Sequence, residues 1–217
     1  DSTQIPILAD TEFDGRQRKL MLFPNRNAFF YVLDRETGEF LLGEPYARQT
    51  WAEGLDETGR PIRIPNTFPS VDGTTVSPSI GGGSNWWSPS YSPRTDLLYV
   101  MAYDGETTYF IRDDEYVAGD PFRGGGGRTP LPQASYVSAV RAISPQTGER
   151  VWEYQVQPRS TAGVLSTAGD VVFSGTIDGF FFALDAETGE ELWHINVGSR
   201  VHAGPMSYAV DGKQYVA

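Results

Sequence analysis

Few side chains in this sequence have types and positions that could do chemistry. There is no cysteine, which excludes disulfides, thiolate metal sites, cysteine nucleophiles and covalently attached c-type haem within the segment. His194 and His202 lie in strand-like runs without a partner at metal-binding spacing, so we expect both to be structural. From residue type alone, Arg26 would pair with an acidic neighbour at a turn. Asn85 follows shortly after three glycines and would cap its turn.

The composition favours β-strands as the elements that position these side chains. The 217 residues include 24 glycines and 15 prolines, and 13% of them are aromatic, which suits short strands joined by tight turns. The net charge of −11 is opposite to the basic surface that a nucleic-acid-binding protein needs. No stretch approaches the roughly 18 apolar residues of a membrane span.

An internal repeat is the strongest signal in the sequence. Residues 32–42, 142–152 and 183–193 each contain an apolar strand end, a Thr-Gly turn and a second strand. An Asp or Ser opens each turn by accepting backbone N–H groups, and the Gly supplies a positive φ. Gly148 and Gly189 are 41 positions apart, close to the length of one four-stranded propeller blade. We expect Trp152 and Trp193 to hold equivalent positions, wedged between blades.

The repeat predicts an all-β fold, namely a β-propeller of four-stranded antiparallel blades in one partial domain over residues 1–217. The predicted blades cover about 4–44, 86–156 and 164–197, and residues 202–217 begin a further one. A long polar connection spans about 45–85, and an insertion from Asp104 to Ala134 interrupts the second blade. Its four glycines, 124–127, lack the Lys-Ser/Thr of a phosphate-binding loop, so we expect a flexible loop.

The two ends of the sequence suggest a piece of a longer chain. It opens on Asp1 with neither an initiator methionine nor a signal peptide, and it stops at Ala217 inside an apolar run. Three blades also leave unpaired edges, because each blade buries its faces only against its neighbours. We therefore expect about three blades of a larger propeller.

Four longer segments carry motifs of a known family. Residues 16–38 contain Arg-Lys-Leu and Asn-Arg-Asn-Ala-Phe-Phe-Tyr-Val-Leu-Asp-Arg, and residues 81–100 contain Gly-Gly-Gly-Ser-Asn-Trp-Trp and Leu-Leu-Tyr-Val. Residues 163–193 and 211–217 complete the set. In this order they resemble the C-terminal half of the propeller in PQQ-dependent (quinoprotein) alcohol and methanol dehydrogenases, which use pyrroloquinoline quinone (PQQ) and calcium. Ala28 departs from the glycine usual in the family.

The resemblance implies a role for each candidate residue. Arg26 matches the arginine that contacts the quinone oxygens and stabilises the reduced quinone. Asn85 matches an asparagine that hydrogen-bonds the cofactor. Asp1 falls on the position of the general base, which also lies beside the metal. Lanthanide-using relatives carry a second Asp two residues later, where this sequence has Thr3, so the resemblance implies calcium.

The resemblance implies an enzyme, a periplasmic oxidoreductase with an eight-bladed propeller. It would oxidise small primary alcohols and pass electrons to a cytochrome c-type acceptor, whereas the isolated segment would be inactive. A non-catalytic propeller scaffold of the outer-membrane assembly type, or a ligand sensor, is the alternative, since the repeats alone fit all three. Arg26, Asn85 and Asp1 favour the enzyme, because a scaffold has no reason to keep them.

Overall fold

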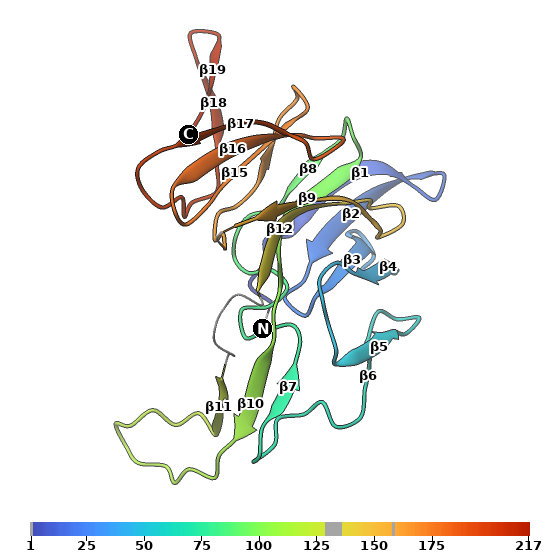
Figure 1. Ribbon diagram of the computed structural model, residues 1–217. Coiled ribbons are helices and arrows are strands. Elements are labelled where there is room, and N and C mark those ends of the chain that lie inside the picture. Colours follow the sequence, from blue (N-terminus) through green and yellow to red (C-terminus); the bar gives the residue numbers. More distant parts are fainter. Residues whose placement is uncertain (1, 129–135, 158) are drawn as a thin grey trace.

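The chain folds into antiparallel β-sheets (Figure 1). The computed structural model describes residues 2–128, 136–157 and 159–217, and these ranges contain strands and turns but no helix. It follows that no helix in the described ranges could cross a membrane. The predicted all-β fold of four-stranded antiparallel sheets is confirmed.

Three sheets have four strands each. The first contains β1 (Ile7–Phe13), β2 (Arg16–Pro24), β3 (Phe29–Asp34) and β4 (Phe40–Pro45) in chain order. The second contains β8 (Ser90–Ser92), β9 (Leu97–Asp104), β12 (Val137–Ile143) and β13 (Arg150–Val156). The third contains β14 (Leu165–Ser166), β15 (Val171–Gly175), β16 (Phe180–Asp185) and β17 (Glu191–Asn196). A hairpin of β18 (Ser207–Val210) and β19 (Lys213–Val216) follows.

The turn between the last two strands of each sheet has the predicted chemistry. Asp34 Oδ1 accepts hydrogen bonds from the backbone N–H groups at positions 36 and 37, at 3.0 and 3.1 Å. Asp185 Oδ1 repeats this pair of bonds at 2.9 Å, and Ser144 Oγ accepts one such bond at 3.2 Å. Gly38, Gly148 and Gly189 follow with φ between 73° and 77°, a region that glycine enters without a steric penalty.

Neighbouring sheets meet at these same turns. Trp152 lies on β13 opposite Ala142, and its indole N–H donates to the carbonyl of Ala186 in the next sheet at 3.0 Å. The ring packs so closely on Gly189 that an added Cβ there would lie 2.6 Å from it. Trp193 holds the same place on β17, opposite Ala183, but it is 48% exposed. The two positions are equivalent in register and unlike in burial, because nothing in the described residues covers β17.

The second sheet is buried on both faces, as its central strand β9 shows. Successive side chains of a strand point to opposite faces. Leu98 and Val100 accordingly join a core shared with the first sheet, whereas Tyr99 and Met101 join a core shared with the third. All four are at most 1% exposed. The buried strand therefore fixes the order in which the three sheets stack.

Two smaller sheets project from the end of the stack that is lower in Figure 1. The hairpin of β5 (Ala52–Leu55) and β6 (Pro61–Arg63) comes from the connection after the first sheet. The other sheet joins β7 (Thr74–Val76), β10 (Thr107–Ile111) and β11 (Gly125–Arg128). The prediction of a plain loop at 124–127 is therefore wrong. A Cβ on Gly125 would lie 2.2 Å from the carbonyl oxygen of Phe110, so the glycine permits a close approach of two backbones.

Candidate functional site

Arg26 stands in the turn that joins β2 to β3. The backbone N–H of Ala28 donates to the carbonyl of Asn25 at 3.0 Å and closes this turn. Ala28 is fully buried and has a φ of 77°, a left-handed conformation that costs any residue with a Cβ about 1–2 kcal/mol. The turn keeps its shape here despite the alanine.

The side chain of Arg26 is fixed by the segment before Asn85. Its guanidinium donates to the carbonyl oxygen of Ile80. A Cβ added to Gly82 would lie only 2.2 Å from the Cγ of Arg26, so the side chain packs against this glycine. The backbone of Arg26 also accepts a hydrogen bond of 3.0 Å from the N–H of Gly83. In the part of the chain that the structure describes, Arg26 has no carboxylate partner. The expected pairing with an acidic neighbour is thus not seen there.

Asn85 caps its own turn, as its sequence context predicts. Its Nδ2 donates to the carbonyl oxygen of Gly81 at 2.8 Å, and its Oδ1 accepts from the N–H of Trp86 at 3.0 Å. The hydroxyl of Thr3 donates to the same oxygen at 3.3 Å. Asn85 remains half-buried.

The structure brings Arg26 and Asn85 to one place. Their side chains donate to the carbonyls of two successive residues, Ile80 and Gly81. Arg26 lies in the β2–β3 turn, whereas Asn85 lies in the connection between β7 and β8. Ser2 is close by, because its hydroxyl accepts a hydrogen bond of 2.9 Å from Asn25. Asp1 lies outside the described residues.

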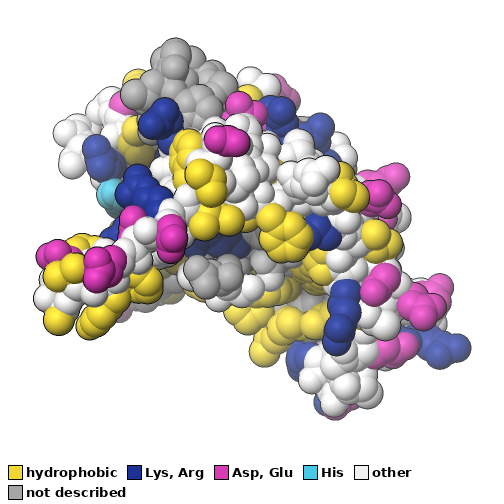
Figure 2. Space-filling view, turned by 90° about the horizontal axis from the view of Figure 1, so that it is seen from below, with side chains coloured by type: hydrophobic (Ala, Val, Ile, Leu, Met, Phe, Trp, Pro, Cys, Tyr) yellow, Lys and Arg dark blue, Asp and Glu magenta, His cyan; other side chains and the backbone are white. Residues whose placement is uncertain are grey.

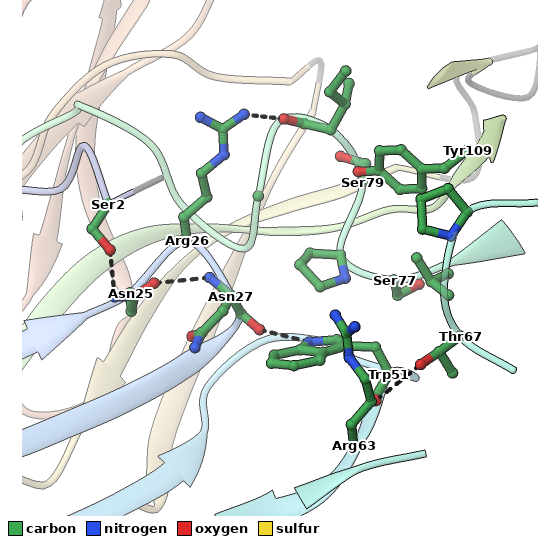
Figure 3. Close-up of a pocket in the computed structure, with 15 residues that line it drawn as sticks. Ser2, Asn25, Arg26, Asn27, Trp51, Arg63, Thr67, Ser77, Ser79 and Tyr109 are labelled. Carbon is green, nitrogen blue, oxygen red and sulfur yellow. Dashed lines mark hydrogen bonds between the residues drawn. The ribbon is translucent and has the colours of Figure 1, made fainter. Parts of the chain in front are cut away.

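A cavity of about 600 Å³ opens beside Arg26 (Figure 3). Its wall comes from the β2–β3 turn, the β5–β6 hairpin, β7 and β10. The lining residues are Ser2, Asn25, Arg26, Asn27, Trp51, Arg63, Thr67, Pro69, Val76, Ser77, Pro78, Ser79, Ile80, Gly82 and Tyr109. Two of them are arginines and none is acidic, although the whole chain carries a net charge of −11. The cavity is therefore suited to anionic or electron-rich ligands.

The far wall of the cavity comes from residues that the sequence did not single out. The indole N–H of Trp51 donates to the carbonyl of Asn27 at 3.1 Å, which ties this wall to the Arg26 turn. The guanidinium of Arg63 lies 5.7 Å from the centre of the Trp51 ring and 3.8 Å from that of Phe68. Burial raises the pKa of the Tyr109 hydroxyl above its ordinary value, against the opposing effects of Thr107 and of the Arg26 charge.

The donor set suits a quinone cofactor better than it suits a metal ion. PQQ is rich in carbonyl and carboxylate oxygens, which the Arg26 guanidinium and the Asn85 amide can bind. Calcium takes six to eight oxygen ligands, and it favours carboxylates. Among the described residues no group of three His, Cys, Asp or Glu side chains could hold an ion. The described part of this site offers only neutral oxygens, such as those of Thr3 and Asn85.

The two histidines lie apart from this site and from each other. His194 Nδ1 lies 2.5 Å from Glu191 Oε1 on the exposed strand β17. His202 Nδ1 lies 2.9 Å from the hydroxyl of Thr161. Trp87 packs in the core shared by the second and third sheets, whereas Trp86 is 53% exposed.

Comparison with known proteins gives a consistent result. Residues 156–216 match the PQQ family model described as "Glucose/ethanol/alcohol dehydrogenase, beta-propeller domain". The chain is 38% identical to a quinoprotein ethanol dehydrogenase from Pseudomonas putida, over 94% of this chain and 34% of that protein. It is also 38% identical to a 1-butanol dehydrogenase (cytochrome c) from Thauera butanivorans, over 100% of this chain and 33% of that protein.

Solved structures agree with the sequence relatives. The quinohemoprotein alcohol dehydrogenase from Comamonas testosteroni superposes with a TM-score of 0.91 and 32% identity, over 99% of this chain and 34% of that one. A europium-containing methanol dehydrogenase superposes with a TM-score of 0.88 and 31% identity, over 98% and 38% of the two chains. The chain thus spans about a third of the length of its relatives. By sequence and by fold, it belongs to the PQQ-dependent alcohol dehydrogenase family.

Proposed function

We propose that this chain is the part of a quinoprotein dehydrogenase that supplies Arg26, Asn85 and Asp1 to a PQQ and calcium site for oxidising primary alcohols. The observation that carries the proposal is the convergence of Arg26 and Asn85 on the successive carbonyls of Ile80 and Gly81. Two turns far apart in sequence are held together there, beside a cavity whose described lining residues include no acidic side chain.

Each residue has a chemical task in this proposal. PQQ, held by Arg26 and Asn85, would supply an electrophilic carbonyl as hydride acceptor, and calcium, held in part by Asp1, would supply Lewis acidity. The Arg26 guanidinium, which has no carboxylate partner among the described residues, stabilises negative charge that develops on the quinone oxygens. Asn85 orients the cofactor with its amide. Asp1 takes the alcohol proton as general base and contributes an oxygen to the metal.

The names of the relatives support the substrate and the acceptor. They are dehydrogenases of ethanol, 1-butanol and methanol, and the 1-butanol enzyme is named with cytochrome c. We extend these properties to the protein that contains this chain: small primary alcohols as substrates, a cytochrome c-type protein as electron acceptor, and a periplasmic location. Thr3 in place of a second Asp supports calcium over a lanthanide.

The full-length protein, loaded with PQQ and calcium, tests the proposal. It should reduce an acceptor dye with 1-propanol, and Asp1→Ala should abolish that activity. Arg26→Gln should lower kcat by about 100-fold while PQQ is retained, because one preorganised donor to a developing oxyanion contributes about that much. Arg16→Gln, an exposed arginine on β2, is the matched control and should change nothing.

The other outcomes decide between the alternatives. Retention of PQQ without turnover of any alcohol would replace the enzyme with a ligand sensor. Failure to bind PQQ at all would favour a scaffold. The isolated 217-residue chain should be inactive, because its described residues bring no cluster of metal ligands together.

A further inference from the structure

A second arginine in the cavity has no task in the proposed reaction. Arg63 ends β6, on the wall that faces the Arg26 turn (Figure 3). It forms no ion pair with any residue that the structure describes. Unpaired arginines are common on surfaces, but this one lines a cavity in which none of the described lining residues is acidic. Its charge is therefore available to a ligand.

The guanidinium of Arg63 is held in place by aromatic rings. It lies 3.8 Å from the centre of the Phe68 ring and 5.7 Å from that of Trp51. Cation–π contacts of this kind orient an arginine without neutralising its charge. Since Trp51 is itself hydrogen-bonded to the carbonyl of Asn27, the position of Arg63 is set relative to the Arg26 turn. The fork of N–H donors can then meet a carboxylate in two hydrogen bonds.

A buried hydroxyl in the same cavity also lacks a partner. Ser77 is 1% exposed, and its Oγ has no hydrogen bond within the described ranges. Its backbone is fully engaged, because its N–H donates to Thr50 Oγ1 at 2.9 Å and its carbonyl accepts from the Thr50 N–H at 3.0 Å. A buried hydroxyl without a partner is costly, so a ligand acceptor here would stabilise the site.

The face that carries the cavity is not dominated by acidic groups. Figure 2 shows this end of the molecule from below, where basic, acidic and hydrophobic side chains are interspersed. Arg60, on the same β5–β6 hairpin as Arg63, does not line the cavity. Arg60 and Arg63 therefore carry the same charge but only Arg63 lies at the cavity. This pair offers a matched comparison.

We propose that Arg63, with Ser77, binds the carboxylate of a hydroxy acid whose primary alcohol group reacts at the Arg26 end of the cavity. The inference rests on the proposed function and narrows its substrate class from alcohols in general to short ω-hydroxy acids. The volume of about 600 Å³ accommodates such a molecule. Arg63 thus selects the substrate by its charged end and takes no part in the chemistry at the hydroxyl.

The test compares two substrates of equal length in the full-length protein loaded with PQQ and calcium. The probes are 4-hydroxybutanoate and 1,4-butanediol, which differ in the charged end. Arg63→Gln should lower kcat/KM for 4-hydroxybutanoate about tenfold, mainly through KM, and leave that for 1,4-butanediol within about twofold. Ser77→Ala should act in the same direction by a smaller factor. Arg60→Gln, the control, should alter neither substrate.

A binding measurement separates this inference from the proposed function. Calorimetric titration with butanoate, which cannot react, should show binding that Arg63→Gln weakens about tenfold and that 0.5 M NaCl also weakens, because an exposed pair is screened. If this holds while no alcohol is turned over, the proposed function fails and the carboxylate site stands. If 1,4-butanediol is oxidised normally and Arg63→Gln leaves 4-hydroxybutanoate unaffected, the carboxylate site fails and the proposed function stands.

Two further results would overturn the assignment. Equal losses of kcat/KM for both substrates in Arg63→Gln would mean that the arginine shapes the cavity and does not recognise the carboxylate of the substrate. A weaker retention of PQQ in Arg63→Gln, measured by absorbance after dialysis, would mean that the carboxylate at Arg63 belongs to the cofactor. The thermal unfolding midpoint of each variant checks that the fold is intact.

Discussion

Thr3 donates a hydrogen bond of 3.3 Å to the side-chain oxygen of Asn85, 82 residues further along the chain. The bond ties the segment before β1 to the turn that also fixes Arg26. A charged side chain at position 3 would therefore lie next to Asn85 in the proposed cofactor site.

The first prediction concerns metal choice. Thr3→Asp adds a carboxylate next to Asn85, and a trivalent ion gains more from an added negative charge than calcium does. In the full-length protein this variant should bind europium at least tenfold more tightly relative to calcium than the wild type, as measured by europium luminescence in competition with calcium. Ser199→Asp, on an exposed loop after β17, is the charge-matched control. An unchanged europium-to-calcium ratio would separate Thr3 from the metal.

The second prediction uses the contact between Gly82 and Arg26. Gly82 has a φ of 83°, and a Cβ there would lie 2.2 Å from Arg26 Cγ and 2.6 Å from the carbonyl oxygen of Ser84. Gly82→Ala should destabilise the protein by more than about 1 kcal/mol and displace Arg26. Denaturant unfolding and dye-linked alcohol oxidation should both show losses. Gly54→Ala, where nothing lies within 4 Å of the added Cβ, should affect activity little; full activity in Gly82→Ala would show that Arg26 needs no fixed position.

The third prediction concerns the strained alanine. Ala28→Gly removes a left-handed strain of about 1–2 kcal/mol, but it also frees the unfolded chain and removes a buried methyl group, at about 0.4–1 and 0.8 kcal/mol. These effects nearly cancel, so the free energy of unfolding should change by less than about 1 kcal/mol. Ala28→Val should lose more than about 3 kcal/mol, because a Cβ on Gly83 would already lie 3.0–3.1 Å from Ala28.

The control for position 28 is Ala209→Val on the exposed strand β18, which should be nearly neutral. Chemical denaturation of the three variants gives the comparison. A valine tolerated at position 28 as well as at 209 would refute the tight packing of this turn.

The fourth prediction concerns the buried Arg141. This side chain is 2% exposed, and it donates to the carbonyl of Tyr46 at 2.9 Å, to Asp104 at 3.1 Å and to Glu153 at 2.7 Å. Burial alone would raise the pKa of Asp104, but the bonds from Arg141 prevail and hold that pKa below its usual value. Asp104→Asn leaves part of a buried charge unpaired and should cost about 3 kcal/mol at pH 7.

The pH dependence of this loss has a fixed sign. Because the pKa of Asp104 is lower in the folded than in the unfolded state, its contribution to stability is complete at neutral pH. It disappears as the pH falls below about 4 and through the folded-state pKa. Denaturant unfolding from pH 7 to pH 3 should therefore show the difference between wild type and Asp104→Asn shrinking with acid. Asp113→Asn, an exposed carboxylate, should show no such difference.

The parts of the fold that follow local rules were predictable from the sequence. Asp34, Ser144 and Asp185 open turns that a glycine completes, and short-range hydrogen bonds decide that geometry. The exposure of Trp193 was not predictable, because its burial depends on a neighbouring sheet and not on its own strand. The same Thr-Gly turn precedes both Trp152 and Trp193 in the sequence, so the sequence gives no difference between them.

The cavity could not be predicted from the sequence, for a related reason. Apart from the Arg26 turn, its wall comes mostly from segments expected to be a polar connection and an insertion, in which no alternation of apolar residues marks a strand. Strand β7 from the first segment pairs with β10 from the second, across about 30 residues. This pairing brings Tyr109 on β10 to the cavity that Arg63 and Ser77 also line. Arg26 and Asn85 were found by resemblance, whereas their shared support at Ile80 and Gly81 needed the structure.

The turn glycines have a consequence for how the protein unfolds. Gly148 receives the side chains of Leu42 and Glu44, and Gly189 receives the ring of Trp152. Each turn therefore both completes its own sheet and forms the contact surface for the preceding one. Such an arrangement couples nearest neighbours, like links in a one-dimensional array. Loosening of one sheet should pass to the adjacent one before it reaches the sheet beyond. Cooperativity should weaken toward β17, whose outward face has no such contact with any residue that the structure describes.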